Sequence, residues 1–392
     1  MSKVRIVIAG EIYSPNLGDG LIFETMKYLY HRLDPLVEII PLDISGRTSW
    51  KADQTTAAYR LNLIAYAKRS ASRLYTIINS TRLEAQYRQS LRQRWRRILA
   101  EADMLVIGGG QLLMDDHLDF PLKLNKLTKL AVEKGLPVHI SACGVGGRWS
   151  ARGQHLIREV LSLAESISLR DRISIKRMER FFPGFSPRLT GDPAIWAAQL
   201  YEGPPANQPT KVGLGVINIF DLNLHHRQPK LAHKQVVNFW LRFFEGLAGN
   251  GYPFELFTNG NLSDERFARL LAGLAKDRLS LFVPQAQRPL TPAELVRQIS
   301  WYRGVMAFRL HALLLAASYL IPCIGLGWDE KVGSLFEELQ LSENVFPYGE
   351  LNMKEIFTRL RHIIEAGVEY PTIDNMKAKA ILNPQIVLGR SG

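Results

Sequence analysis

The chain has 392 residues, of which 46% are apolar and 22% are charged, and its formal net charge is +12. This length is enough for two domains with buried cores, and the balanced composition excludes a disordered or a solenoid protein. The positive charge leaves nucleic acid, an anionic membrane and an anionic substrate as candidate partners, so its position along the chain matters more than its size.

Short apolar runs alternate with amphipathic stretches through the first half of the chain. The runs are typical of buried parallel strands, and the stretches are typical of the helices that cover them. Strands are expected at 4–9, 37–41, 104–107, 138–142 and 166–169, and helices at 21–33, 122–134, 150–164 and 173–182. This alternation predicts a doubly wound parallel sheet.

The positive charge gathers in one segment, residues 59–99, which holds ten basic side chains against a single acid, Glu84. Apolar residues recur there every three or four positions, which predicts an amphipathic helix. Two interpretations stay open. Either the apolar stripe packs on the domain and the arginines are solvated, or the helix docks on an anionic membrane through Arg88, Arg92, Trp95 and Arg96. Nucleic acid is not expected, because no recognised binding module accompanies the charge.

A second α/β region follows a segment rich in helix and strand breakers at 202–210. Strands are expected at 211–218, 253–258, 304–307 and 323–326, and helices at 234–249, 264–275, 291–299 and 311–319. We therefore predict two Rossmann-like α/β domains that face each other across a cleft. The predicted parts are an N-terminal domain over 1–201 with the basic helical insertion at about 50–100, a linker over 202–210, a C-terminal domain over 211–370 and a tail over 371–392.

The sharpest local feature is Phe308-Arg309-Leu310-His311, which lies between an expected strand and an entirely apolar expected helix. A histidine changes its charge near neutral pH, as a general acid or base must. An arginine beside a buried helix needs an anion or a carboxylate as its partner, because burial of an unpaired guanidinium costs several kcal/mol. The motif therefore indicates an anion site with an acid or base, although a structural histidine that caps a buried helix is the alternative.

Two glycine-rich loops follow expected strands. Asn16-Leu17-Gly18-Asp19-Gly20 comes after the first strand, where glycines allow close approach of the backbone to a ligand and a helix start offers free amide donors. A tight turn with Asp19 as the helix cap is the alternative. Gly108-Gly109-Gly110 follows the third strand, and the nearby Asp115 and Asp116 add polar groups that a simple turn would not require.

Two further cations follow expected strands. Arg170 could pair locally with Asp171, or it could bind a phosphate or carboxylate with two parallel hydrogen bonds. Lys331 could add charge to an anion site or lie on the surface.

These motifs, in this order, resemble the polysaccharide pyruvyl transferase family. The matching pieces are Asn16-Leu17-Gly18-Asp19, Gly108–Gly110, Gly144-Val145-Gly146, Leu169-Arg170-Asp171, Gly191-Asp192-Pro193, Arg309-Leu310-His311 and Lys331. The resemblance spans roughly residues 5–345. It implies a GT-B-like fold, that of the two-domain glycosyltransferases, and a phosphoenolpyruvate donor. The basic insertion departs from the compact family core, so the acceptor cannot be inferred through it.

The resemblance also implies roles for individual residues. Arg309, Leu310, Arg170, Lys331, Gly109 and Gly110 would bind phosphoenolpyruvate, and His311 would protonate its methylene carbon. Asp19 would take the proton of the attacking sugar hydroxyl, and Asn16, Asp115 and Asp116 are candidates for the acceptor side. Two hydroxyls of one sugar would then close a cyclic pyruvate ketal with release of phosphate.

The expected partners are phosphoenolpyruvate and a sugar acceptor of a bacterial envelope polysaccharide or exopolysaccharide, which a polyprenyl carrier could hold. No cofactor and no metal is expected, because the histidines and the two cysteines lack ligand spacing. The same cysteines and the short first apolar run suggest the cytoplasm, with the inner face of the cytoplasmic membrane as the surface for a peripheral contact. Two rival functions remain: a glycosyltransferase that uses a nucleotide sugar, and a non-catalytic membrane-associated scaffold.

Overall fold

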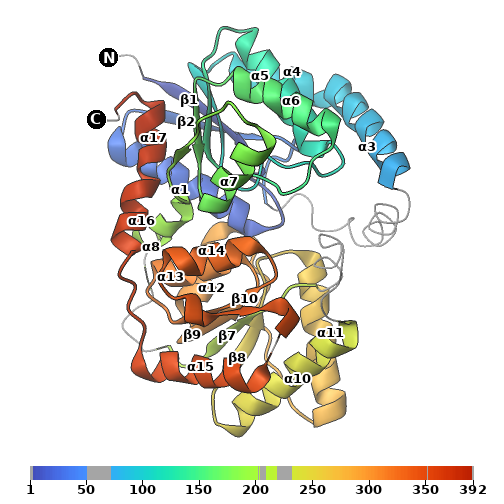
Figure 1. Ribbon diagram of the computed structural model, residues 1–392, viewed down its shortest axis with the longest axis vertical. Coiled ribbons are helices and arrows are strands. Elements are labelled where there is room, and N and C mark those ends of the chain that lie inside the picture. The colour runs from blue at the N-terminus through green and yellow to red at the C-terminus, as the bar shows by residue number, and fades with distance from the viewer. Residues whose placement is uncertain are drawn as a thin grey trace. The chain divides into compact units, whose positions relative to one another are not determined.

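The computed structural model describes residues 3–50, 72–201, 203, 209–218, 232–350 and 352–390, and the chain forms two compact units. Unit 1 comprises residues 1–14, 22–193 and 376–392, and unit 2 comprises residues 15–21 and 194–375. The predicted fold class of two Rossmann-like α/β domains is confirmed, since each unit is built on one parallel sheet (Figure 1).

Unit 1 contains a six-stranded parallel sheet in the order β2-β1-β3-β4-β5-β6. Its strands are β1 (Arg5–Gly10), β2 (Glu38–Asp43), β3 (Met104–Gly108), β4 (Val138–Cys143), β5 (Ser166–Leu169) and β6 (Arg188–Leu189). Its helices are α1 (Leu17–Leu33), α3 (Ser72–Gln86), a π-helical turn (Tyr87–Leu91), α4 (Arg92–Leu99), α5 (Asp119–Val132), α6 (Ala151–Ser162) and α7 (Arg172–Phe181). The strand order reverses between β1 and β3, which makes their carboxyl ends a switch point where ligands bind in such sheets.

Helices cover both faces of this sheet, as the continuous apolar strands require. Val7 and Ala9 of β1 belong to a core that also includes buried residues of α4, α5, α6 and α7. Ile6 and Ile8 alternate with them and are also fully buried, on the opposite face. Helix α1 lies close to the end of β3, where a side chain on Gly109 would meet Ile22.

Unit 2 contains a five-stranded parallel sheet in the order β11-β10-β9-β7-β8, with its switch point between β7 and β9. Its strands are β7 (Val212–Gly215), β8 (Phe254–Phe257), β9 (Gly304–Ala307), β10 (Cys323–Gly327) and β11 (Val345–Pro347). Its helices are α8 (Ala197–Leu200), α10 (His233–Gly249), α11 (Leu262–Leu279), α12 (Pro292–Ser300), α13 (Leu310–Ser318), α14 (Glu330–Glu338) and α15 (Met353–Ala366).

One face of the second sheet packs on α10, α11 and α15, whose aromatic residues fill the core with Phe308. The opposite face meets α14, because a side chain on Gly325 would collide with Phe336 and Val332. Helix α13 is almost entirely buried, as its apolar sequence predicts.

The predicted linker at 202–210 lies largely outside the described residues, and the boundary between the two units falls after Pro193. Instead of a tail, the last residues form the helices α16 (Ile373–Ala380) and α17 (Leu382–Val387). Residues from Met376 onward belong to unit 1. Asn383 there accepts hydrogen bonds from Ser168 and Thr190, at 2.8 and 2.6 Å.

Candidate functional site

The Arg309-Leu310-His311 motif lies at the switch point of unit 2. Strand β9 ends at Ala307, and Arg309 is the residue before the first turn of α13, which no side chain caps. Helix α13 therefore presents its first amide groups and its positive dipole end at the carboxyl edge of the sheet, a combination that favours anions. The motif stands where the sequence predicted it, between a strand and a buried helix.

The guanidinium of Arg309 is held by Asp264, a residue that the sequence analysis did not single out. Asp264 Oδ2 accepts hydrogen bonds from Nε and Nη2 of Arg309, at 2.9 and 2.5 Å, and its other oxygen accepts from the backbone N–H of Asn218 at 2.8 Å. Asp264 is fully buried and lies in the first turn of α11. It neutralises Arg309 and fixes its orientation, while the remaining N–H donors of the guanidinium can bind a ligand.

His311 and Gly18 come into direct contact, so two motifs that are far apart in the sequence meet in one unit. A Cβ atom on Gly18 would lie 2.5 Å from Nδ1 of His311 and 2.8 Å from its Cβ atom. The histidine is buried, with 7% of its surface exposed. Glycine is therefore required at position 18 by the histidine ring rather than by a ligand.

Residues 15–21 pack on the loop that follows β8. The backbone N–H of Leu17 donates to the carbonyl oxygen of Asn259 at 3.0 Å, and Gly260 lies against Leu17 with a positive φ of 93°. Within the first turn of α1, the side-chain amide of Asn16 donates to Asp19 at 3.2 Å. Asn16 and Asp19 therefore flank Gly18, the residue that contacts His311, whereas the expected helix start at residue 21 was four residues too late.

Lys331 lies at the same sheet edge, after the strand next to β9. It is buried in the first turn of α14, and its backbone N–H donates to the capping carboxylate of Asp329 at 3.0 Å. The indole N–H of Trp328 donates to the carbonyl oxygen of Phe308 at 2.8 Å, which ties the loop after β10 to the loop after β9. Arg309 and the start of α13 thus follow strand β9, and Lys331 follows the neighbouring strand β10, at the same edge of the sheet.

Arg170 belongs to unit 1 and is paired within it. Its guanidinium lies 3.3 Å from Asp171 and 3.0 Å from Asp192, and its side chain is 3% exposed. Gly144 lies against the same guanidinium, where a Cβ atom would come within 3.3 Å of Nε. The local ion pair is therefore the interpretation that the structure supports. Two carboxylates therefore pair with this buried arginine and fix its orientation.

Gly109 and Gly110 are explained by backbone geometry. Their φ angles are +78° and +75°, in the left-handed region that favours glycine, and Gly109 also leaves room for Ile22 of α1. The carbonyl oxygen of Gly110 accepts from the N–H of Gly144 at 2.9 Å. Positive φ angles and the close approach of α1 therefore account for glycine at these two positions.

Asp115 also has a structural role. One of its oxygens accepts from the backbone N–H of Leu118 at 2.9 Å, and the other accepts from the backbone and the hydroxyl of Ser150 at 2.8 and 2.6 Å. It thereby links the loop after β3 to the start of α6. Asp116 is half-buried in the same loop. Both residues belong to unit 1, whereas Arg309 and His311 belong to unit 2.

A model of the polysaccharide pyruvyl transferase family matches residues 16–330. The chain belongs to this family. The match begins at Asn16 and includes Arg170, Arg309 and His311, whereas Lys331 lies one residue beyond its end. No curated protein matches the chain closely enough to name a relative.

Solved structures similar to this family member share its fold at low sequence identity. The S. aureus MnaA–UDP co-structure is 12% identical, with a TM-score of 0.53, and the match covers 99% of this chain and 98% of that one. The UDP-GlcNAc 2-epimerase of Methanocaldococcus jannaschii is 10% identical, with a TM-score of 0.54 and coverage of 99% and 100%. A trehalose-phosphate synthase of Burkholderia vietnamiensis is 14% identical, with a TM-score of 0.51 and coverage of 100% and 96%. These matches establish the GT-B-type fold of the chain.

A polar cluster at the switch point of unit 1 was missed by the sequence analysis. Arg47 binds Glu11 at 2.7 Å and Asp43 at 3.3 Å, and the buried Lys123 donates to Ser45 at 2.8 Å. Burial alone would raise the pKa of Glu11, but the nearby Arg47 and Lys123 outweigh it and lower that pKa. Asp43 ends β2, and residues 44–47 follow it directly. Polar residues at the end of the second predicted strand were therefore the signal that could have revealed this cluster.

The basic helix packs its apolar stripe on unit 1, as one of the two interpretations proposed. Trp95 is fully buried and contacts Tyr87, so its expected role as a membrane contact is wrong. Periodicity placed it correctly on the apolar face, but that face meets the protein core. Arg88, Arg92 and Arg96 are exposed. The part of the predicted insertion at 51–71 lies outside the described residues.

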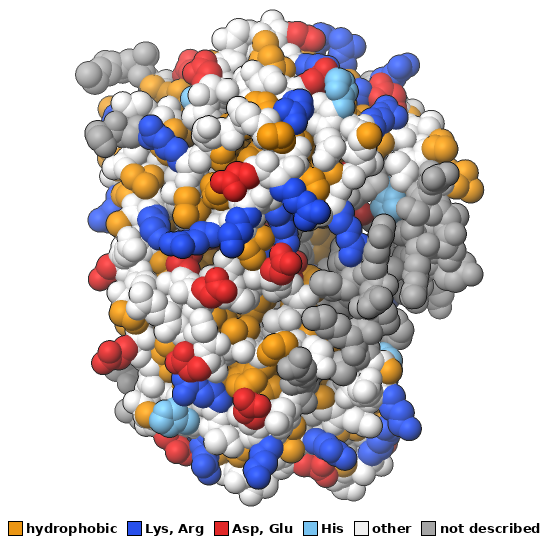
Figure 2. Space-filling model, viewed as in Figure 1, with side chains coloured by type: hydrophobic (Ala, Val, Ile, Leu, Met, Phe, Trp, Pro, Cys, Tyr) orange, Lys and Arg blue, Asp and Glu red, His pale blue; other side chains and the backbone are white. Residues whose placement is uncertain are grey.

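The same helix also carries exposed apolar residues, which the predicted apolar stripe did not indicate. Leu74, Ile77 and Ile78 of α3 are 58%, 63% and 57% exposed. Hydrophobic side chains are visible at the right-hand edge of Figure 2, where Figure 1 places α3. Among the described residues, no helix is long and apolar enough to cross a bilayer, and no group of three side chains of the metal-binding types is suitably placed for a metal ion.

Proposed function

We propose that the chain transfers the pyruvyl group of phosphoenolpyruvate to two hydroxyls of one sugar and forms a cyclic ketal. Family membership supports pyruvyl transfer in polysaccharide synthesis. The choice of site rests on one observation. Arg309, His311 and the loop that bears Asp19 meet at the carboxyl edge of the second sheet, at its switch point.

Donor binding would use the charges and dipoles of this edge. Phosphoenolpyruvate carries a phosphate and a carboxylate, and the site supplies the remaining donors of Arg309, the uncapped start of α13 and the cation of Lys331. Asp264 keeps the guanidinium in place in the absence of the donor, so little reorganisation is needed when it binds. Arg170 would act indirectly, by holding the loop at Gly144.

The reaction would begin with a proton transfer. His311 donates a proton to the methylene carbon of phosphoenolpyruvate, which becomes a methyl group, and the central carbon becomes electrophilic. A sugar hydroxyl attacks that carbon and loses its proton to Asp19. The bond from carbon to phosphate oxygen then breaks, and a second hydroxyl attacks. Of the two hydroxyl protons, one replaces the proton that His311 gave and the other leaves with phosphate.

The transfer is tested by mass spectrometry of lipid-linked oligosaccharides incubated with phosphoenolpyruvate and protein. We expect a mass gain equal to pyruvic acid minus one water, with equimolar release of phosphate. His311→Asn keeps a polar side chain of similar shape but removes the acid, so it should abolish the product while donor binding persists. Wild-type activity in the His311→Asn variant would refute the catalytic assignment, and it would leave the scaffold function open.

A nucleotide-sugar transferase is the rival for the same fold, because the solved neighbours include enzymes crystallised with UDP or UDP-GlcNAc. The same incubation therefore includes UDP-GlcNAc as an alternative donor. A sugar-sized mass gain with UDP-GlcNAc and none with phosphoenolpyruvate would favour the rival.

We also propose that unit 1 contacts an anionic membrane through α3 rather than through Trp95. Leu74, Ile77 and Ile78 would insert among the lipid chains, and the exposed arginines that follow them would meet the head groups. Such a contact suits an acceptor held on a polyprenyl carrier at the inner face of the cytoplasmic membrane.

Liposome flotation tests this contact. The double variant Ile77→Glu with Ile78→Glu should no longer float with vesicles that contain phosphatidylglycerol. The matched control is Leu270→Glu in α11 of unit 2, where the leucine is 44% exposed. Equal flotation of both variants and the wild type would refute the assignment of α3.

A further inference from the structure

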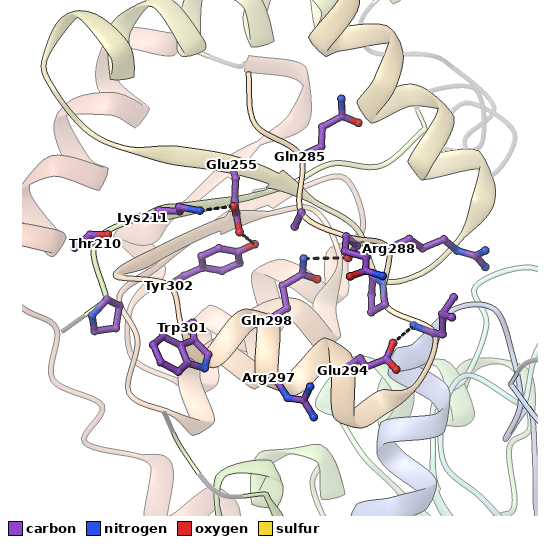
Figure 3. A pocket seen from close by; sticks show the side chains of 15 residues that line it. Thr210, Lys211, Glu255, Gln285, Arg288, Glu294, Arg297, Gln298, Trp301 and Tyr302 are labelled. Carbon is purple, nitrogen blue, oxygen red and sulfur yellow. Dashed lines mark hydrogen bonds and ion pairs between the residues drawn. The ribbon is translucent and has the colours of Figure 1, made fainter. Parts of the chain in front are cut away.

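A cavity of about 870 Å³ lies beside the edge strand β8 and helix α12 in unit 2 (Figure 3). Its volume falls within the range of about 300–1,000 Å³ that is typical of ligand sites. None of the residues predicted from the sequence lines it. Helix α12 contributes Glu294, Arg297 and Gln298 to its lining. Gln285 and Ala286, which lie beside Leu256 along the outer edge of β8, also line it.

Three polar side chains joined by hydrogen bonds form the floor of the cavity. Glu255 accepts from Lys211 Nζ at 2.9 Å and from the hydroxyl of Tyr302 at 3.0 Å. The ring of Tyr302 fills the space above Gly213, where a Cβ atom would come within 2.2 Å of a ring carbon. Figure 3 shows the three polar ends together on one side of the cavity. A ligand therefore meets donors and acceptors that are already in place.

Next to this polar chain, the lining carries an aromatic side chain, Trp301, and an amide, Gln298 (Figure 3). Trp301 follows the last turn of α12 and is 39% exposed, which is unusual for a large aromatic side chain in a pocket wall. Gln298 donates from Nε2 to the carbonyl oxygen of Gln287 at 3.4 Å, and its Oε1 atom has no hydrogen-bond partner in the part of the chain that the structure describes. This unpaired oxygen is an acceptor that a ligand hydroxyl can use once the amide turns toward the cavity.

We propose that this cavity binds a saccharide. The face of an indole carries negative partial charge and attracts the C–H groups on one face of a sugar ring. The amide, carboxylate, ammonium and phenol groups match the alternating donors and acceptors of sugar hydroxyls. The charged side chains of the lining are Lys211, Arg288 and Arg297 against Glu255 and Glu294. This near balance suits a neutral or singly acidic sugar better than a nucleoside diphosphate.

The cavity is connected to the candidate active site within the same unit. Arg288 lines the cavity, and its Nε donates to the carbonyl oxygen of Gly260 at 2.7 Å. Gly260 in turn lies against Leu17 of the loop that contacts His311. The saccharide is therefore assigned as a more distant part of the acceptor glycan, and this assignment, unlike saccharide binding itself, rests on the proposed function.

The test is a glycan array of bacterial-type di-, tri- and tetrasaccharides, probed with the full chain in the absence of phosphoenolpyruvate and followed by calorimetry on the glycans that bind. We expect the wild type to bind at least one neutral or singly acidic glycan, and Trp301→Ala to bind it about tenfold more weakly. Gln298→Ala should also weaken binding. The matched control is Phe282→Ala, because Phe282 is 81% exposed and does not line the cavity.

The proposal is overturned if no glycan on the array binds the folded wild type, or if Trp301→Ala and Phe282→Ala bind equally well. It is also overturned if uridine monophosphate displaces the glycan, since the cavity would then be a nucleotide site. Circular dichroism confirms that each variant is folded. Because donor and glycan are titrated separately, a failure of phosphoenolpyruvate to bind would refute the proposed function and leave saccharide binding standing.

Discussion

Because Gly18 contacts His311, the methyl group added in Gly18→Ala tests directly how the site is packed. In Gly18→Ala the new Cβ atom would lie 2.5, 2.7 and 2.8 Å from Nδ1, Cγ and Cβ of His311, whereas ordinary contacts begin at 3.4 Å. Rotation of the imidazole would not relieve the clash, because the histidine Cβ atom is itself too close. The start of α13 or the loop at residues 15–21 must therefore move.

The required movement sets the expected effect on the rate. The overlap amounts to about 1 Å, and a displacement of that size at a reacting group costs roughly a hundredfold in rate. We expect kcat to fall by about that factor, while the KM for phosphoenolpyruvate changes less, because Arg309 is anchored separately by Asp264.

The assay is phosphate release at saturating phosphoenolpyruvate with a lipid-linked oligosaccharide fraction as acceptor. The matched control is Gly273→Ala on the exposed face of α11, where nothing lies within 4 Å of the added atom. That control should keep full activity and gain about 0.5–1 kcal/mol of stability. If Gly18→Ala retained wild-type kcat, the close packing of His311 against the loop would have no catalytic role and the reasoning would fail.

Three further predictions concern the anchor, the basic helix and the thiols. Asp264→Asn should weaken phosphoenolpyruvate binding in calorimetry and lower the free energy of unfolding by about 3 kcal/mol or less, since Arg309 is partly exposed and loses its only charged partner among the described residues. Trp95→Ala should lower the unfolding free energy by about 3–5 kcal/mol in denaturant titration, without a change in liposome binding at equal folded protein. Burial raises the pKa of Cys143 and Cys323 to about 12, so a thiol reagent should modify them only after unfolding. Their contribution to stability should fall as the pH rises from 9 toward 12, because the unfolded chain then loses protons that the native thiols retain.

Strands and buried helices were predictable because their apolar runs are nearly continuous. β9 was predicted with its observed bounds, and α13 within one residue, so the position of Arg309 and His311 at a strand end followed from the sequence. The start of α1 was missed because Gly18 and Gly20 are poor helix formers and mark a loop. There the requirement for close packing against His311 outweighs helix propensity.

The partners of the charged residues were not predictable from a single sequence. Asp264 lies 45 positions before Arg309 and was read only as part of a helix. Arg170 was left undecided between pairing and anion binding, and only the positions of Asp171 and Asp192 resolve it. The stripe that contains Trp95 shows the same limit, because periodicity identifies an apolar face but not the surface that this face meets.

The most direct test of the account is a calorimetric titration of the full chain with phosphoenolpyruvate, repeated on Arg309→Lys. Lysine keeps the charge but cannot form the paired hydrogen bonds of a guanidinium. We predict binding to the wild type and at least about tenfold weaker binding to the variant. Absence of binding at millimolar phosphoenolpyruvate, together with clear binding of UDP-GlcNAc, would contradict the central claim that this edge of the second sheet is a phosphoenolpyruvate site.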